Sequence, residues 1–528
     1  MMASLDSFQW FLDSPARVLG ERHRWVSLGL GIAVQLCVGT LYSVSAWGVA
    51  LRGKTGWAND EDLSLATTVG TLGVYLAVHN GLALDQFGAR PCLVFSSIAL
   101  FTGWHLLAHV ASSEGSPAAA AFALGLIGQG SVTAFLASLA PNVGNFNDKD
   151  QGKVHGVLLA GFGGSSALFS VAYRSAFVGN LPGFFGFAGW VTSFVAACNA
   201  YATLDGTRTG NRARNNTHSS GIGLTKLPST PYRELREDEL RLVSEGNSST
   251  VEVSDEAQGG REESNSKPPE DSAAMETEQN SGEHAVPSAD ATYDTANQPL
   301  PIHLKRLFAS QTFWVIYAHL VLTLGTALLW VNQAGPFAVV ADEKVNAQSA
   351  SLATLVILFS LGNVCGRVFC GAASDFCESK FGAPRSVFLI IGAVAMCFGA
   401  GALASSPGRE EIRNAVAVVV GLAEGTIMAS WTSTVRSVFG EERFGLHLAI
   451  YNSALALGSS AFNGFAAVAT ADPGVDGNGE VLGYKATFAV ATTACGGATL
   501  LGLAIVKATK REAEEVRANA RRRGEMDG

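Results

Sequence analysis

Hydrophobic and polar positions alternate along this chain in long blocks. Apolar runs recur throughout both halves, and about 20 consecutive apolar residues are enough for a helix to cross the hydrocarbon of a bilayer. Six such runs are expected in the first half and six in the second. They lie near residues 25–49, 62–84, 91–112, 117–140, 154–177 and 183–204, and then 311–339, 347–373, 385–406, 412–434, 445–470 and 483–506. The pattern therefore predicts an all-α membrane protein with twelve transmembrane helices.

A strongly polar segment separates the two apolar blocks. Residues 241–300 hold thirteen acidic and three basic side chains, with Ser, Asn, Gly and Pro between them. Such a segment buries too little apolar surface to offset its ordering entropy, so we expect a disordered linker. The predicted organisation has five parts: an N-terminal tail at 1–24, a six-helix bundle at 25–205, the linker at 206–305, a second six-helix bundle at 306–506 and a basic tail at 507–528.

Composition agrees with this plan and narrows the functional classes. Of the 528 residues, 48% are hydrophobic and only 15% are charged, whereas about 25% charged is usual in a soluble domain. The formal charge of −9 comes almost wholly from the linker, so it indicates no cationic partner. The eight cysteines show no CxxC pair, which favours packing roles over a metal site. Walker, nucleophile-elbow and dinucleotide motifs are absent from the sequence, so an ATP-driven pump or a hydrolase is disfavoured and no cofactor is expected.

The distribution of Lys and Arg in the short connecting segments predicts the orientation. With the N-terminus inside, the inner segments outside the linker hold 17 basic residues and the outer segments hold 7. Positive charge is enriched on the cytoplasmic side of membrane proteins, so both termini and the linker are expected to be cytoplasmic. The sequence favours a plasma membrane or a vacuolar-type membrane without choosing between them.

The two blocks also repeat each other. Four short motifs recur in the same order at offsets of 286 to 295 residues. Such a repeat indicates a duplicated six-helix unit, which is the architecture of transporters whose halves rock around a midplane site. The pairs are Gly39-Thr40 with Gly325-Thr326, Gly81 and Asp85 with Gly371 and Asp375, Gln129-Gly130 with Glu424-Gly425, and Gly164–Ala167 with Gly458–Ala461.

The segment from Gly81 to Arg90 is similar to the loop motif Gly-x-x-x-Asp-x-x-Gly-x-Arg/Lys of the major facilitator superfamily. With twelve spans and a long middle loop, the whole chain outside its tails and linker resembles that superfamily. Within it, the chain looks most like the nodulin-like transporters and the fungal monocarboxylate-transporter-like proteins. Four stretches carry that narrower resemblance, namely Gly39–Ser43, Asn145-Phe146, Gly366–Asp375 and Phe439–Gly445.

The resemblance implies a latch at the cytoplasmic gate. In the superfamily this motif closes the inner gate of the outward-facing state, and an Asp there can accept hydrogen bonds from a helix N-terminus or pair with a basic residue. The alternative is an ordinary turn with an Asp cap. Gln86 and Pro91 stand where basic residues are usual, which would weaken the gate. The residues expected to form the gate are Gly81, Asp85, Gly88 and Arg90, with Gly371 and Asp375 in the second half.

Glu424 is the candidate proton-coupling residue. It lies midway along an otherwise apolar expected span, where a carboxylate is costly unless it is paired, hydrated or protonated. Its counterpart in the repeat, Gln129, cannot titrate, so coupling is expected in the second half. A structural hydrogen bond to a neighbouring helix is the alternative.

Arg367 is the candidate substrate-binding cation. A guanidinium offers bidentate hydrogen bonds to a carboxylate, and Arg367 lies about two turns before Asp375 in the eighth expected span. Alternatively, Arg367 could snorkel to the cytoplasmic surface or pair with Asp375. Polar side chains on the first, second, fourth and seventh spans are further cavity candidates, with interhelical hydrogen bonding as the equal alternative. These residues are Gln35, Tyr42, Ser43, His79, Gln129 and Asn332.

Together these features predict a secondary active transporter, not an enzyme, that works by alternating access as a monomer. The expected substrate is a small organic anion such as a monocarboxylate, moved with a proton. An amino acid or a zwitterionic metal chelator is the alternative substrate, and a non-transporting sensor that signals through its acidic linker is the alternative class. Besides substrate and protons, the expected partner is the lipid bilayer, with no role for nucleic acid.

Overall fold

The computed structural model describes residues 23–57, 60–113, 115–146, 150–203, 299–341, 345–406, 409–440, 443–471 and 482–526. Most of the predicted linker, residues 1–22 and the last two residues lie outside these ranges, whereas most of the predicted basic tail lies within them. Within them the secondary structure consists of α-helices and one short 3-10 helix. The predicted all-α fold with two six-helix halves is confirmed.

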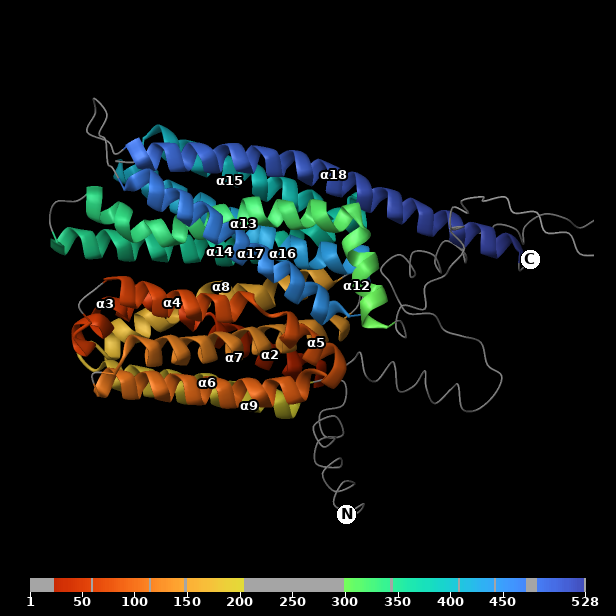
Figure 1. The fold of residues 1–528 in the computed structure, drawn as a ribbon. Coiled ribbons are helices and arrows are strands. Elements are labelled where there is room, and N and C mark those ends of the chain that lie inside the picture. Colours follow the sequence, from red (N-terminus) through yellow and green to blue (C-terminus); the bar gives the residue numbers. More distant parts are fainter. Residues whose placement is uncertain are drawn as a thin grey trace, which may run out of the picture.

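The first half is a bundle of helices that run back and forth between two ends (Figure 1). Its first span bends at a 3-10 turn, and its second is interrupted after Tyr75. The elements are α2 (His23–Val38), η2 (Thr40–Ser43), α3 (Val44–Thr55), α4 (Asp60–Tyr75), α5 (Val78–Phe87), α6 (Ala89–Ser112), α7 (Pro117–Gly144), α8 (Gln151–Ala176) and α9 (Leu181–Ala202).

The second half repeats this arrangement beside the first. A short helix, α12, precedes it, and its last helix continues well past the bundle (Figure 1). The elements are α12 (Leu300–Ala309), α13 (Gln311–Ala341), α14 (Val345–Phe381), α15 (Val387–Ser405), α16 (Glu410–Phe439), α17 (Phe444–Thr470) and α18 (Leu482–Met526). The end of the molecule where α2 begins, α9 ends and α12 lies is called the linker end below.

Ten of the expected spans are long and apolar enough, within the described residues, to count as membrane-crossing helices by length and composition alone. The other two are also helical but do not meet these criteria. The second expected span is broken into α4 and α5, and the eleventh is the single helix α17.

Glycines bring the same pair of helices together in both halves. A Cβ on Gly73 of α4 would lie 2.7 Å from the carbonyl oxygen of Gly125 in α7. In the second half, Cβ atoms on Gly366 of α14 and Gly425 of α16 would overlap the backbone of the opposite helix. Small residues let membrane helices approach closely, so this contact holds α4 to α7 and α14 to α16.

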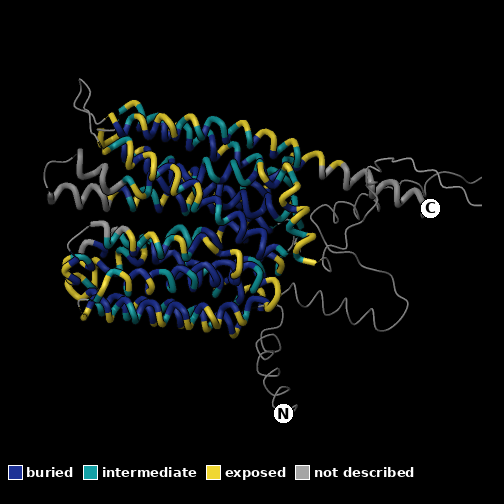
Figure 2. Tube along the Cα trace, in the orientation of Figure 1, coloured by how far each residue is buried: buried dark blue, intermediate teal, exposed yellow. Residues whose placement is uncertain are grey.

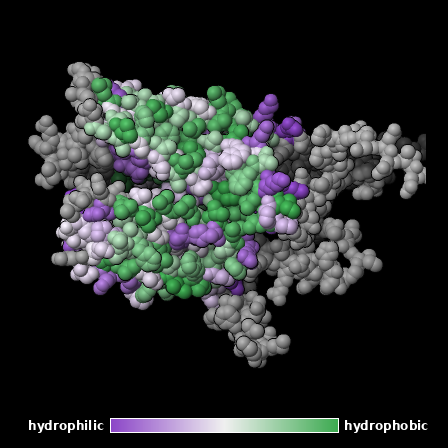
Figure 3. Space-filling view, in the orientation of Figure 1, coloured by the Kyte–Doolittle hydropathy of each residue, from purple (hydrophilic) through white to green (hydrophobic). Residues whose placement is uncertain are grey.

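The outer surface is apolar and the buried residues lie between the helices. Large hydrophobic side chains such as Phe122, Phe194, Phe369 and Phe398 are 65% to 74% exposed. Figure 2 shows buried residues along the inner faces of the helices, and Figure 3 shows hydrophobic side chains spread over much of the visible face of both halves. A surface of this kind fits a lipid environment.

Candidate functional site

Two carboxylates hold the halves together at the linker end. Asp85, in the last turn of α5, accepts hydrogen bonds from the backbone N–H groups of Gly445 (2.9 Å) and Leu446 (2.8 Å), the first turn of α17. These donors are among the N–H groups that a helix start leaves without an internal partner, and the helix dipole favours a negative charge beside them. Asp85 thus joins the first half to the second.

Asp375 makes the same contact in the opposite direction. From α14 it accepts hydrogen bonds from the N–H groups of Gly152 (2.9 Å) and Lys153 (2.8 Å) at the start of α8. In addition, Arg385 forms an ion pair of 2.9 Å with Asp375 and a second one of 2.7 Å with Glu378. The two caps are related by the repeat, and Arg385 belongs to the second of them.

Glycines make both caps possible because they remove side chains from the helix crossings. A Cβ on Gly81 would overlap the carbonyl oxygen of Gly445 and lie 2.6 Å from the Cβ of Ala449. A Cβ on Gly371 would overlap the carbonyl oxygen of Gly152 and lie 3.0 Å from the Cα of Gly156. The linker end is therefore closed by two tight, pseudo-equivalent contacts, α5 with α17 and α14 with α8, which are also visible in Figure 1.

The other two expected gate residues have different partners. Gly88 lies between α5 and α6 with a φ of +85°, which an L-residue adopts only with strain, so it is needed for the turn. Arg90 donates from Nη2 to the carbonyl oxygen of Thr203 at the end of α9, over 3.4 Å. Arg90 therefore contacts its own half, and the arginine that forms an ion pair with Asp375 is Arg385.

A histidine contact lies beside the Asp85 cap. Nε2 of His303 in α12 is 3.0 Å from Nε2 of His447 in α17, and the two rings are stacked. Burial and the charges of Arg443 and Arg306 lower the pKa of His303 from its ordinary value. The contact fixes α12 against the start of α17.

Arg367 lies deeper, where α14 faces α8 across the interface between the halves. It is 1% exposed and donates from Nη1 to the carbonyl oxygen of Leu159, over 2.6 Å. Its guanidinium carbon lies 5.4 Å from the centre of the Phe162 ring. Among the described residues, Asp375 forms its ion pair with Arg385 and not with Arg367. A buried cation thus lies between the two halves.

Glu424 lies on α16, next to α14. Its Oε2 accepts a hydrogen bond of 2.8 Å from Nδ2 of Asn363, one turn before Arg367. The charges of Glu424 and Arg367 attract each other electrostatically. The candidate coupling acid and the candidate substrate cation therefore share one region of the interface.

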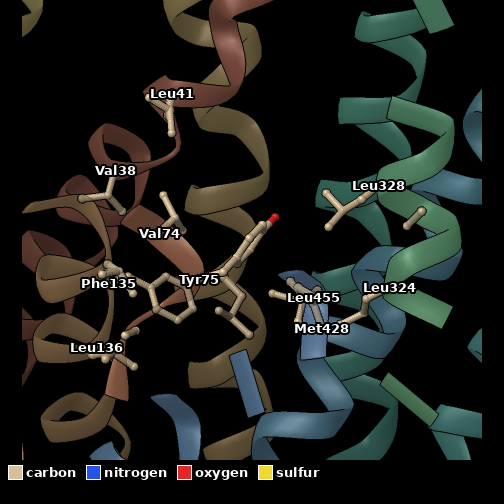
Figure 4. Close-up of a cluster of buried hydrophobic side chains, with 14 of the residues drawn as sticks. Val38, Leu41, Val74, Tyr75, Phe135, Leu136, Leu324, Leu328, Met428 and Leu455 are labelled. Carbon is tan, nitrogen blue, oxygen red and sulfur yellow. The ribbon is translucent and has the colours of Figure 1, made fainter. Parts of the chain in front are cut away.

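The first half contributes two phenols to this region. Tyr42 in η2 donates to the hydroxyl of Tyr75 at the end of α4, over 2.9 Å, and both interact electrostatically with Glu424. In Figure 4 the Tyr75 side chain points from the first half toward the second, where Leu324, Leu328, Leu455 and Met428 lie. Asn452 of α17 completes the contact by donating to the carbonyl oxygen of Val74, over 3.0 Å.

His79 and Gln129 lie at the interruption of the second span and form hydrogen bonds there. Nε2 of Gln129 donates to the carbonyl oxygens of Gly73 (2.8 Å) and Leu76 (3.4 Å), which the end of α4 leaves free. His79 Nε2 in turn lies 2.8 Å from Oε1 of Gln129. Membrane backbone groups freed at a break need such partners, so Gln129 stabilises the interruption between α4 and α5.

Three further cavity candidates lie away from Arg367. Gln35 is fully buried and donates to Ser138 (2.9 Å) and to the carbonyl oxygen of Phe135 (3.2 Å). Ser43 is also buried and accepts a hydrogen bond from Trp47 over 3.1 Å. Asn332 is exposed near the other end of α13. The hydrogen bonds of Gln35 and Ser43 within the described part of the chain thus remain in the first half.

Sequence reasoning missed Arg385, Asn363 and Asn452, because their importance comes from partners far along the chain. For Arg385 the repeat offered one signal, because a carboxylate at Asp375, like the one at Asp85, needs a partner. Within the described residues no group of three or more His, Cys, Asp or Glu side chains is placed to hold a metal ion. All eight cysteines are free thiols.

Comparison with known proteins places this arrangement in context. A family model described as Major Facilitator Superfamily matches residues 28–462 and, in a second match, 307–525. The fold is similar to that of the human organic anion transporter MFSD10 (TETRAN), with a TM-score of 0.54 over 92% of this chain and 99% of that chain. The two sequences are 14% identical, so this similarity concerns the fold. No curated protein matches the sequence.

Proposed function

The chain belongs to the major facilitator superfamily and is a multi-pass membrane transporter, and from this premise we propose that it moves a small organic anion together with a proton. The halves would rock about the region of Arg367 and Glu424, which opens alternately to each side of the membrane. The observation that carries the proposal is the buried Arg367 at the interface between the halves. We assign the protein to the monocarboxylate-transporter-like group because of this arginine and because of the motifs Gly39–Ser43 and Gly366–Asp375.

Arg367 is suited to bind the anion. A guanidinium stays charged when it is buried, and it recognises carboxylates through two parallel hydrogen bonds. Its Nε has no hydrogen-bond partner among the described residues, so one donor is free for a ligand. An anion here would contact both halves, because Arg367 already bonds to Leu159 across the interface.

Glu424 is suited to carry the proton. A carboxylate within a membrane helix is costly when it is ionised, and binding a proton removes that cost because it neutralises the group. Glu424 is close enough to Arg367 for their charges to interact. An anion bound at Arg367 would therefore repel the ionised Glu424 carboxylate. Binding of the anion and protonation of Glu424 would therefore favour each other, which is the requirement for symport.

The closed linker end supports an assignment of state. If the linker end is cytoplasmic, as the Lys and Arg distribution predicts, the Asp85 and Asp375 caps close the cytoplasmic side. The structure then corresponds to an outward-facing state, and both caps must open for release to the cytoplasm.

Uptake by purified protein in proteoliposomes tests the proposal. Labelled acetate, lactate and pyruvate would be offered with and without an inward proton gradient. We expect uptake above protein-free liposomes that the gradient increases and that Arg367→Lys strongly reduces, because an ammonium cannot reproduce the planar donor pair. Absence of uptake for all three acids would exclude the monocarboxylate assignment.

A zwitterionic substrate is the second candidate. Opposite charges of Arg367 and Glu424 on neighbouring helices suit a molecule with both a carboxylate and an ammonium group. Amino acids and metal chelates would then replace the carboxylates in the same assay. In that case Glu424→Gln should abolish binding itself rather than proton dependence.

A further inference from the structure

A short amphipathic helix crosses the linker end of the molecule. α12 lies across the ends of the bundle helices rather than along them (Figure 1). Its inward side is apolar, because Leu307 is buried and Leu300 and Leu304 pack against the core. Residues three and four apart share a face of a helix, so these three leucines form one stripe. The opposite side of α12 faces away from the protein.

This outward side carries two cations and two large apolar side chains. Lys305 and Arg306 are exposed, and so are Ile302 at 46% and Phe308 at 43%. Figure 3 shows hydrophilic and hydrophobic side chains next to each other at this place. Water suits the cations but not the apolar side chains, and the hydrocarbon of a bilayer suits only the apolar ones. The combination fits the boundary between lipid headgroups and acyl chains.

The neighbouring span shows the level of the membrane at which α12 lies. Ser310 alone separates α12 from α13, and Gln311–Gln333 of α13 is a membrane-crossing helix by length and composition. Trp314, in the first turn of this span, is 51% exposed, and its Nε1 donates to the carbonyl oxygen of Phe308 over 2.8 Å. Tryptophan at the end of a span is typical of the membrane–water interface. α12 is therefore bonded to the span at the level of the headgroups.

A second contact fixes which side of α12 faces outward. His303, on the inward side, has its Nε2 3.0 Å from Nε2 of His447 in the first turn of α17. Turning Lys305 and Arg306 toward the protein would break this contact and expose the buried Leu307. The cations are thus held on the outward side by the packing of the helix.

We propose that α12 lies in the surface of the leaflet at the linker end and binds the headgroups of anionic phospholipids through Lys305 and Arg306. The distribution of Lys and Arg predicts that this leaflet is cytoplasmic, and there anionic lipids attract basic segments beside a span. Ile302 and Phe308 enter the boundary region, while the long stems of the two cations let their charged ends reach the phosphates. The inference is independent of the substrate and of proton coupling.

The acidic linker is the competing occupant of this surface. Its thirteen acidic residues, within 241–300, precede the two cations closely in the chain. A polar segment paired with Lys305 and Arg306 would leave Ile302 and Phe308 in water, and exposed apolar area is unfavourable there. A bilayer covers the apolar and the charged side chains together, so it is the favoured occupant.

A spin label at Ala309 measures the depth of α12. Ala309 is exposed on the outward side, one turn after Lys305. Ala309→Cys would be introduced into the full-length protein with its native cysteines replaced, and the labelled protein reconstituted in phosphatidylcholine vesicles with or without phosphatidylserine. Collisions with oxygen, which dissolves in lipid, and with a nickel chelate, which stays in water, report the depth.

We expect the label to collide mainly with oxygen, and phosphatidylserine should increase this preference because it draws the cations to the surface. A label that collides mainly with the nickel chelate in both kinds of vesicle would overturn the membrane location of α12.

Removing the two cations tests the contact with headgroups. Lys305→Gln with Arg306→Gln should reduce the effect of phosphatidylserine on the label by about fivefold or more, and high salt should reduce it in the parent protein as well. Lys54→Gln with Arg174→Gln is the matched control, because it removes the same charge from exposed positions at the opposite end of the molecule. There the label should respond as in the parent. Equal responses of the two double variants would overturn the role of the cations.

Deleting residues 206–298 distinguishes the bilayer from the linker. If the bilayer covers the outward side, the label responds to phosphatidylserine alike in the full chain and in the deletion variant. A response that arises only after the deletion would show that the linker covers Lys305 and Arg306 in the full chain, and would overturn the proposal. None of these measurements requires a transported substrate, so a failure of the proposed function is distinguishable from a failure of this inference.

Discussion

Asp375 connects three segments at once: the end of α14, the start of α8 and Arg385 before α15. Sequence repetition predicted that it would share a role with Asp85, and both residues do cap a helix of the opposite half. The partners themselves were not predictable, because Gly152 is 223 residues away from Asp375 in the chain and Gly445 is 360 away from Asp85. Local patterns identify a costly carboxylate but not the distant N–H groups that compensate for it.

Asp375→Asn should open the linker end. An amide lacks the charge that Arg385 and the α8 N-terminus stabilise, and a hydrogen bond to a charged group contributes about 1.5–3 kcal/mol. Cys370, which is 1% exposed and lies beside Gly371, is a native reporter. In a variant whose other cysteines are replaced, maleimide labelling of Cys370 should become about tenfold faster or more.

Asp150→Asn is the control for this measurement. Asp150 pairs with Lys153 over 2.8 Å, but both side chains are half exposed, so the pair contributes little. Labelling of Cys370 should then match the parent protein. Equal labelling rates in the Asp375 and Asp150 variants would show that the Asp375 cap does not hold the gate.

At the scale of elements, helix crossings formed by glycines determine how the halves meet. Apolar run length predicted every span, and the structure has a helix or a broken helix at each of them. The break between α4 and α5 was not predicted, since Tyr75 to Val78 are all compatible with a continuous helix. It depends on Gln129 of α7, which binds the freed carbonyl oxygens of Gly73 and Leu76.

Gly371→Ala should weaken the α14–α8 crossing. The added methyl would overlap the backbone of Gly152, so the helices must separate, and we expect faster labelling of Cys370 with slower transport. Gly186→Ala in α9 is the control because its methyl meets no atom within 4 Å. There the substitution should be neutral or should add up to about 1 kcal/mol of helix stability. Identical labelling in the two variants would contradict the role of this crossing.

For the molecule as a whole, transport should depend on the two bundles and not on the segment between them. Residues 204–298 lie outside the described part of the chain, and the bundles meet through α5, α8, α14 and α17. Deleting residues 206–298 keeps α12, and uptake per purified protein should stay within about twofold of the full chain. A sensor that signals through its linker would lose its output in the same variant, and lost uptake would show that the linker takes part in transport.

The sequence predicted the all-α fold with two helical halves but only part of the central region. Hydrophobic run length and the internal repeat are properties of the sequence itself, so they can be recognised in a single chain. Arg367 and Glu424 were recognisable because charge inside a membrane helix is costly. Asn363 gave no such signal, since an uncharged amide in a helix is ordinary until its partners are seen.

Proton movement with the anion is the central claim, and internal acidification measures it most directly. Proteoliposomes containing a trapped pH indicator would receive external lactate at equal pH on both sides, with the signal of protein-free liposomes subtracted. Symport predicts lactate-dependent acidification by the wild type. Glu424→Gln should lose it while still exchanging labelled lactate in counterflow. Acidification of the same size in both proteins, or none in the wild type, would contradict proton coupling through Glu424.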